Sequence, residues 1–169
     1  MKTMSTKNSV NHPLMIKIDL SNKHQFEIPP HEILQKCFET VAAHQNLARA
    51  FISIEIASAN EIQQLNKTYR KQNKPTNILS FPFKGLTGLP NQTPLECFLG
   101  DIVICPEILQ NEAKTQQKRL EHHWCHLLIH GILHLLGYDH ACDNTATEME
   151  QVEILLLEKM NIDNPYIEK

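Results

Sequence analysis

The chain lacks the features that mark several large classes of protein. Among its 169 residues, no apolar run approaches the roughly 18 residues that a membrane-spanning helix requires. Its first residues, MKTMSTKNSVNHPLM, include no apolar stretch as long as a signal peptide needs, and two lysines are too few for a targeting sequence. These absences predict a cytoplasmic protein without a membrane partner.

Paired cysteines and an excess of positive charge are missing as well. The five cysteines are scattered along the chain and form no CxxC pair, which is typical of reduced proteins and not of disulfide frameworks. The formal net charge of -3 argues against a protein that coats nucleic acid through bulk charge. A local basic patch that binds a phosphate backbone remains compatible with this composition.

What the chain does contain is an interleaved series of strand and helix patterns. Alternating apolar residues predict strands, and apolar residues spaced by three or four predict helices. The predicted strands lie within 14–20, 50–57, 74–83 and 98–106, and the predicted helices within 29–46, 58–70, 118–136 and 145–161. We therefore expect one α+β domain over residues 1–169, with a mixed four-stranded sheet packed against helices and a flexible tail at 1–12.

Local signals define where several of these helices begin. Ser58 followed by Glu61 has the pattern of a capping box, and Thr145 with Glu148 is a second candidate. Pro106 suits the first position of a further helix, because the N–H that proline lacks has no partner there anyway.

One strongly apolar segment, HLLIHGILHLLGYDH (126–140), contains four histidines. His130 and His134 are four residues apart, so on a helix they lie on one side and can point at one centre. Gly137 is placed to end the helix in a left-handed conformation, after which the chain can reverse and bring His140 back. Three imidazoles can then converge from two directions.

Three protein ligands with one open position are the pattern of a catalytic zinc site, whereas structural zinc usually takes four. Imidazole also suits nickel, copper and iron, so the spacing alone leaves the metal open. We expect one ion per chain, zinc by preference, bound by His130, His134 and His140. His126 lies one turn earlier and is expected mainly in the surrounding hydrogen bonds, and Cys142 is a less favoured soft ligand.

The same spacing matches H-E-x-x-H-x-x-G-x-x-H, the pattern of metzincin-type zinc peptidases. The residue at the second position is Gly131, where a peptidase needs a glutamate as its base. Peptide hydrolysis by that mechanism is therefore unsupported. A small residue at this position is expected instead to leave room beside the metal.

Ordered blocks of the chain resemble the YbeY family of ribosomal-RNA maturation ribonucleases. HGILHLLGYDH (130–140) is similar to the family signature HGxLHLxGYDH at every specified position. LNKTYRKQNKPTNILSFPF (65–83) is similar to L-N-x-x-Y-R…K-P-T-D-V-L-S-F-P, and LGDIVIC (99–105) to the family's G-D-I strand. TEMEQVE (147–153) resembles its last-helix motif in a looser form. The likeness extends over about residues 58–160.

The resemblance implies an α+β fold with the metal site on the central helix and zinc bound by His130, His134 and His140. It implies a single-strand-specific, zinc-dependent endoribonuclease that acts late in maturation of the 3′ end of small-subunit (16S) rRNA and in ribosome quality control. The implied partners are the rRNA precursor, the small ribosomal subunit and assembly proteins. Arg70 falls on the family's functional arginine.

The chain departs from the family pattern next to the site motifs. Asn77 replaces the usual aspartate of K-P-T-D, and Ala141 replaces a glutamate that often follows the last ligand. Lys71 and Asn73 stand where a glycine and an acidic residue are common. None of these changes removes a proposed ligand, but Asn77 argues against a carboxylate base at that position.

Arg70 belongs to a basic cluster, KTYRKQNK (67–74), of a kind that is often only a solvated surface but that beside a metal cleft can bind phosphate. We expect Arg70 to stabilise charge that develops on phosphorus. The general base stays open between the metal's own water and His126, and Asp139 is expected to shape the turn that returns His140. Two rival functions remain, a metal-stabilised, non-catalytic ribosome assembly factor and a metal hydrolase with another substrate.

Overall fold

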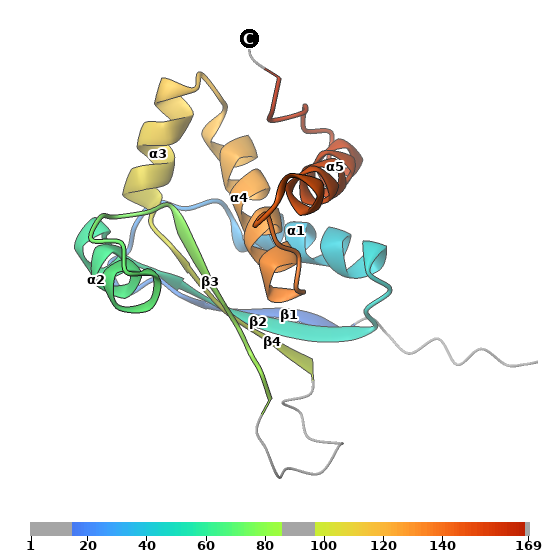
Figure 1. The fold of residues 1–169 in the computed structure, drawn as a ribbon, viewed down its shortest axis with the longest axis horizontal. Coiled ribbons are helices and arrows are strands. Elements are labelled where there is room, and N and C mark those ends of the chain that lie inside the picture. Colours follow the sequence, from blue (N-terminus) through green and yellow to red (C-terminus); the bar gives the residue numbers. More distant parts are fainter. Residues whose placement is uncertain (1–14, 86–96, 168–169) are drawn as a thin grey trace, which may run out of the picture.

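One mixed sheet underlies the helices of this protein (Figure 1). The computed structural model describes residues 15–85 and 97–167, so the predicted tail at 1–12 lies outside the described residues. The strands are β1 (Met15–Ser21), β2 (Arg49–Ile56), β3 (Ile78–Pro82) and β4 (Phe98–Ile104), in the spatial order β1-β2-β4-β3. β1, β2 and β4 are parallel, and β3 is antiparallel to β4. The prediction of a mixed four-stranded sheet is confirmed.

The described residues form α1 (His31–His44), α2 (Ala59–Arg70), α3 (Pro106–Thr115), α4 (Leu120–Leu135) and α5 (Asp143–Lys159). Figure 1 shows α1, α3, α4 and α5 on one side of the sheet, with α2 apart from them near β3. α4 is central because ten of its 16 residues are buried, as its apolar sequence requires. No helix in these parts of the chain is long and apolar enough to cross a membrane.

Both faces of the strand β3 are covered by helices. Successive residues of a strand point to opposite faces, so β3 contacts a helix on each side. Ser80 and its neighbour on β4, Ile102, point toward α4. Leu79 and Val103 point the other way and pack with Ile62 of α2 in a second apolar cluster. α2 and α4 thereby pack against opposite faces of β3 and its neighbour β4.

Two of the three predicted helix starts are confirmed. Ser58 and Glu61 form the reciprocal hydrogen bonds of a capping box at the start of α2. Pro106 is the first residue of α3. The predicted box at Thr145 is wrong, because α5 begins two residues earlier. The Thr145 hydroxyl instead accepts the N–H of Cys142 at 3.3 Å and donates to its carbonyl oxygen at 3.0 Å.

Gly131 lies where α4 packs tightly against β3. A Cβ atom added there would be 2.7 Å from Ile78 Cδ1 and 3.1 Å from Ser80 Oγ. The Ser80 hydroxyl also donates to the Gly131 carbonyl oxygen at 3.0 Å. The prediction that this glycine leaves room beside the metal is therefore wrong, because side chains of β3 occupy the space. A larger residue would have to displace the Ile78 methyl group and press on Ser80, so helix–sheet packing favours glycine at this position.

Gly131→Ala is expected to lower the free energy of unfolding by about 1–3 kcal/mol, the usual cost of an extra carbon in a packed interior. The better helix propensity of alanine, worth up to about 1 kcal/mol, offsets only part of this. Denaturant unfolding measures the change, with Gln151→Ala on the exposed side of α5 as the control. An unchanged midpoint would mean that β3 can move away from α4 at little cost.

Candidate metal centre

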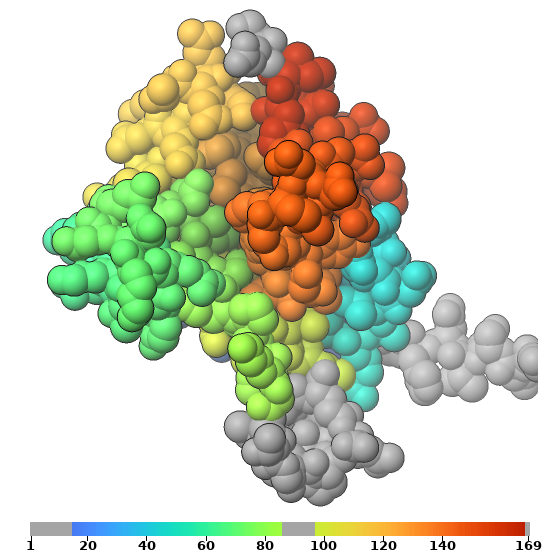
Figure 2. All heavy atoms as spheres, viewed as in Figure 1, coloured from blue at the N-terminus to red at the C-terminus, as the bar shows by residue number. Residues whose placement is uncertain are grey.

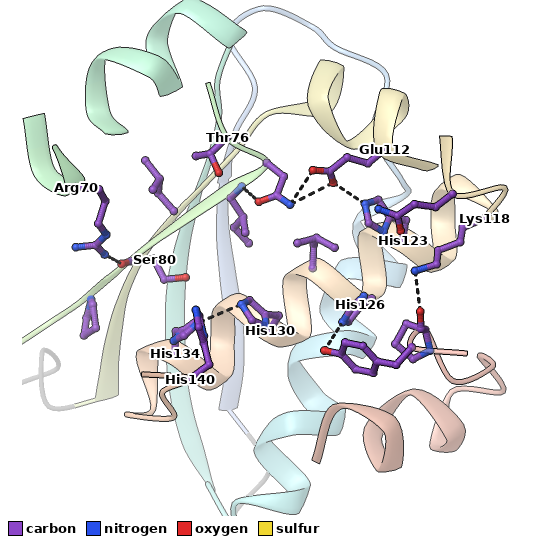
Figure 3. Close-up of a pocket in the computed structure, with 18 residues that line it drawn as sticks. Arg70, Thr76, Ser80, Glu112, Lys118, His123, His126, His130, His134 and His140 are labelled. Carbon is purple, nitrogen blue, oxygen red and sulfur yellow. Dashed lines mark hydrogen bonds and ion pairs between the residues drawn. The ribbon is translucent and has the colours of Figure 1, made fainter. Parts of the chain in front are cut away.

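His130, His134 and His140 converge near the end of α4 (Figure 3). One ring nitrogen of each lies within 4.8 Å of the corresponding atoms of the other two. The Nε2 atoms of His130 and His134 are 3.0 Å apart, because four residues make about one helical turn. The predicted convergence of these three histidines is confirmed, and the group can hold a metal ion.

A tight turn after α4 returns His140 to this point. Gly137 adopts a φ of +94°, as predicted for a glycine that ends a helix. The N–H of Tyr138 then donates back to the carbonyl oxygen of Leu133 at 3.0 Å. Asp139 Oδ1 accepts the backbone N–H of His140 at 2.6 Å. The expected role of Asp139 in shaping this turn is confirmed.

The hydrogen bonds behind the two helical histidines prepare them to bind a cation. His130 Nδ1 lies 2.5 Å from Glu153 Oε1, and His134 Nδ1 lies 2.9 Å from the carbonyl oxygen of Tyr138. Both partners are acceptors, so each Nδ1 carries the hydrogen and each Nε2 presents a lone pair. Two lone pairs facing each other at 3.0 Å repel unless a cation lies between them. The donor set therefore fits a transition-metal ion.

Burial also favours the metal-binding form of these rings. The pKa of the His134 imidazole is lowered, mainly by burial and secondly by the neighbouring His130. A lower pKa keeps more of the ring neutral near pH 7, and only a neutral imidazole binds a metal ion.

Glu153 of α5 is a carboxylate with no exposed surface at the centre of a small hydrogen-bond network. Besides contacting His130, it accepts from His126 Nε2 at 3.0 Å and from the Tyr166 hydroxyl. Burial alone would raise the pKa of Glu153, but the hydrogen bonds from His126 and His130 outweigh it and lower the pKa to about 2. Glu153 is therefore an anion, and it lies next to Nδ1 of His130.

Arg70 faces the same cleft as the three histidines. The cleft has a volume of about 720 Å³. Figure 2 shows the hollow between the segment around residues 70–80 and the end of α4. Arg70 is the last residue of α2, and its guanidinium donates to the Ser80 carbonyl oxygen at 2.8 Å and lies 5.5 Å from the centre of the Phe81 ring. The expected basic side chain thus lines the cleft, at the end where the histidines lie (Figure 3).

The opposite end of the cleft carries Glu112, His123 and Lys118 (Figure 3). Glu112 Oε2 lies 2.8 Å from His123 Nε2, and both of its oxygens accept from the Asn77 amide at 3.2 Å. Burial would raise the pKa of Glu112, but these two hydrogen bonds outweigh it and lower the pKa. An aspartate at position 77 would place a second carboxylate against Glu112, and two like charges in contact repel. The asparagine at this position avoids that repulsion and donates to Glu112 instead.

His126 lies beside the ligand group and not in it. Its Nε2 faces Glu153 and, at 3.2 Å, the Tyr166 hydroxyl. Its Nδ1 is buried and has no hydrogen-bond partner within the described residues. The sequence patterns assigned no site role to Glu153 or Tyr166. The acidic last-helix motif TEMEQVE (147–153) ends at Glu153 and was a signal for that residue, whereas the sequence around Tyr166 gave none.

Removal of the metal is expected to lower the melting temperature without unfolding the chain. An ion present at about 1,000 times its Kd stabilises the native state by roughly 4 kcal/mol, or on the order of 10 °C here. The main apolar core joins α1, α4, α5 and the sheet independently of the ion. Thermal unfolding with and without a chelator measures the shift, and the His134→Ala protein should show none. Loss of the far-ultraviolet circular dichroism at 25 °C on chelation would contradict this prediction.

Comparison with known proteins gives consistent results over most of the chain. Residues 17–161 match the family model described as Endoribonuclease YbeY. The chain is 49% identical over 154 residues to the Endoribonuclease YbeY of Francisella philomiragia subsp. philomiragia, an alignment that covers 91% of this chain and 97% of that protein. It is also 49% identical over 154 residues to the protein of the same name from Francisella tularensis subsp. novicida, covering 91% and 94%.

The fold has a counterpart among solved structures. The solution structure of TM1509 from Thermotoga maritima superposes with a TM-score of 0.54 and 24% identity, and the match covers 87% of this chain and 92% of that one. At this level of identity, the likeness shows a shared fold.

Proposed function

This chain belongs to the YbeY family of endoribonucleases, and from this membership we propose that it is a single-strand-specific, zinc-dependent enzyme. We further propose that it acts late in maturation of the 3′ end of 16S rRNA and in ribosome quality control. The observation that carries the proposal is that the three histidines share one cleft with Arg70. A metal-ligand group beside a cation is suited to stabilising the charge that develops during phosphodiester cleavage.

We propose one zinc ion per chain, bound by His130, His134 and His140, with a fourth position left for water or substrate. When bound, zinc supplies Lewis-acid polarisation of an oxygen in the reaction centre. Glu153 keeps the hydrogen of His130 on Nδ1, so that Nε2 is available. The Tyr138 carbonyl does the same for His134.

Arg70 is proposed to bind the phosphodiester at this end of the cleft. A guanidinium has five N–H donors, and one of them is directed to the Ser80 carbonyl oxygen, which orients the group. The remaining donors suit two phosphate oxygens at once, which a lysine cannot match. His126 is proposed to act through Glu153, as a positioning residue, because its Nε2 is engaged there and its Nδ1 is buried.

The substrate of this reaction is proposed to be a small-subunit rRNA precursor, and the partners the small ribosomal subunit and its assembly proteins. An overall charge of -3 predicts weak binding to free RNA, which favours recruitment by an assembling particle. All five cysteines are free thiols, which is compatible with the proposed cytoplasmic location.

Cleavage of precursor small-subunit rRNA by highly purified protein tests the proposal. The wild type should cut the RNA, and His134→Ala purified in the same way should not. His31→Ala, an exposed histidine at the start of α1, is the matched control and should cut normally. Equal cutting by the wild type and His134→Ala would indicate a contaminating nuclease and remove the support for the proposal.

The same experiment addresses the two alternatives. A metal-stabilised, non-catalytic assembly factor would bind zinc and leave the precursor intact. A hydrolase with another substrate would also leave RNA intact, but its peptidase form has no support, because the second motif position is Gly131 and is packed against β3.

Arg70→Glu is expected to reduce RNA cleavage by at least about 100-fold, since it replaces a cation beside the phosphate by an anion. Zinc content should stay the same, and the free energy of unfolding should change by no more than about 1 kcal/mol, because the side chain is exposed. Lys67→Glu, one turn earlier on α2 and outside the cleft lining, is the control for charge alone. A fall in stability of several kcal/mol would instead identify Arg70 as a structural residue.

A further inference from the structure

The cleft of the metal centre shares part of its lining with a second groove. This flanking groove, of about 650 Å³, lies between the end of α3 with the α3–α4 connection (115–119), the first half of α4, and the C-terminal segment (162–167). Six residues line both hollows: Gln116, Lys118, His123, His126, Pro165 and Tyr166. The two hollows are therefore adjacent, with only these shared residues between them.

The flanking groove offers positive charge next to an exposed aromatic ring. Lys118 and Arg119 are consecutive cations on its lining, and Asp163 is the acidic residue there. Tyr166 is 42% exposed, so one side of its ring is open to solvent, and the neighbouring Ile167 is 67% exposed. Cations that neutralise phosphates beside an aromatic ring that stacks on bases are the combination used to bind single-stranded nucleic acid.

The Tyr166 ring is held in place from behind. Its hydroxyl donates to Glu153, and its ring meets the His126 ring edge-on, with centroids 5.3 Å apart and an interplanar angle of 82°. Next to it, Lys118 Nζ donates to the carbonyl oxygen of Pro165 at 2.8 Å, which ties the C-terminal segment to the start of α4. A ring fixed in this way loses little further entropy when a base stacks on its exposed side.

We propose that the flanking groove binds the nucleotides next to the cleaved bond of a single-stranded RNA. This inference rests on the proposed function and extends it to the substrate's length. The strand runs from Arg70, past the three histidines, to Lys118 at the far end of the cleft, and on to Arg119 (Figure 3 shows Arg70 and Lys118 at opposite ends). Lys118 and Arg119 contact phosphates, and one base stacks on Tyr166.

Binding of two labelled RNA oligonucleotides to the zinc-loaded protein tests this proposal. A strand of about four nucleotides is chosen to fill the cleft alone, and one of about twelve to reach the flanking groove as well, within the range of site sizes of single-strand-binding grooves. Fluorescence anisotropy is recorded within the first minute at several salt concentrations, and a gel then establishes that the RNA is intact. The wild type should bind the longer strand at least about ten times more tightly.

Arg119→Gln should weaken binding of the longer strand about three- to tenfold and leave the shorter strand unaffected. It should also reduce the slope of log Kd against log salt by about 0.7, the value for one lost phosphate contact on a single strand. Arg49→Gln, at the exposed start of β2, removes the same charge far from the groove and should change neither quantity. Tyr166→Leu should weaken binding of the longer strand about tenfold. Tyr166→Phe keeps the ring but loses the hydroxyl that donates to Glu153, so it should weaken binding by clearly less than Tyr166→Leu.

Several results would overturn the proposal. Equal affinity for the two strands would do so, as would equal effects of Arg119→Gln and Arg49→Gln. Binding of poly-glutamate in place of RNA, with the same dependence on Arg119, would make the groove a protein-docking surface instead. Cleavage is measured separately from binding. If the longer strand is bound through Arg119 but never cut, the RNA-binding role of the flanking groove is retained and the proposed nuclease function is contradicted.

Discussion

Replacing His130 or His134 by alanine is expected to remove the metal ion and abolish RNA cleavage. Each substitution deletes one of three nitrogen donors, and the remaining pair cannot form the three-ligand set of a catalytic zinc site. Elemental analysis should show about one metal ion per wild-type chain and less than roughly a tenth of that in either variant. Cleavage should fall by at least about 1,000-fold.

The His31→Ala protein controls for handling and for loss of a histidine as such. Retention of a full complement of metal by His130→Ala and His134→Ala would contradict the assignment and point to a different ligand set. If the variants kept the metal but lost cleavage, metal binding and catalysis would be separate roles. These histidines would then act in catalysis, and the ion would be bound by other residues.

The parts of this site that sequence analysis predicted depend on local geometry. A spacing of four on a helix brings His130 and His134 together whatever surrounds them. Gly137 ends that helix because its positive φ is strained for other residues, and the turn that follows is short enough to return His140. Each of these statements involves residues within about one or two helical turns of each other.

The parts that were missed or wrong depend on packing between distant segments. Glu153 lies 23 positions after His130 on an amphipathic helix, where a glutamate is ordinarily a solvated residue. Only the docking of α5 against α4 buries it beside His130. Gly131 was expected to leave space at the metal, but the space belongs to Ile78 and Ser80 of a strand some fifty residues away in sequence. No local pattern carries this information.

Boundary errors have a similar origin. The capping-box pattern of Thr145 and Glu148 suggested that the last helix starts at Thr145, but the helix begins two residues earlier, at Asp143. The Thr145 hydroxyl bonds the backbone of Cys142 in the first turn, which satisfies groups that a later start would leave to solvent. A threonine near a helix start can serve in either position, so the residue type alone did not decide between them.

Glu153→Gln is expected to weaken zinc binding by about 10- to 100-fold, the range seen when the hydrogen-bond partner of a metal-bound histidine is changed. The amide keeps the size of the side chain but removes the negative charge behind His130. One end of the amide can only donate, so it opposes at least one of the donors now supplied by His126, His130 and Tyr166. Because Glu153 itself is fully buried, the mismatched hydrogen bonds should also cost the fold about 1–3 kcal/mol of stability.

Titration with a competing chelator measures the zinc Kd of Glu153→Gln, and denaturant unfolding measures its stability. Glu158→Gln, an exposed residue further along α5, is the matched control and should change neither quantity. A merely structural role for Glu153 predicts the loss of stability with an unchanged zinc Kd. A role in positioning His130 predicts weaker zinc binding, that is, a higher Kd. The difference should persist well below the unfolding transition, where Glu153→Gln and Glu158→Gln are folded to the same extent. The second result is the one we expect, because the carboxylate reaches the ligand ring directly and no other described residue accepts from His130 Nδ1.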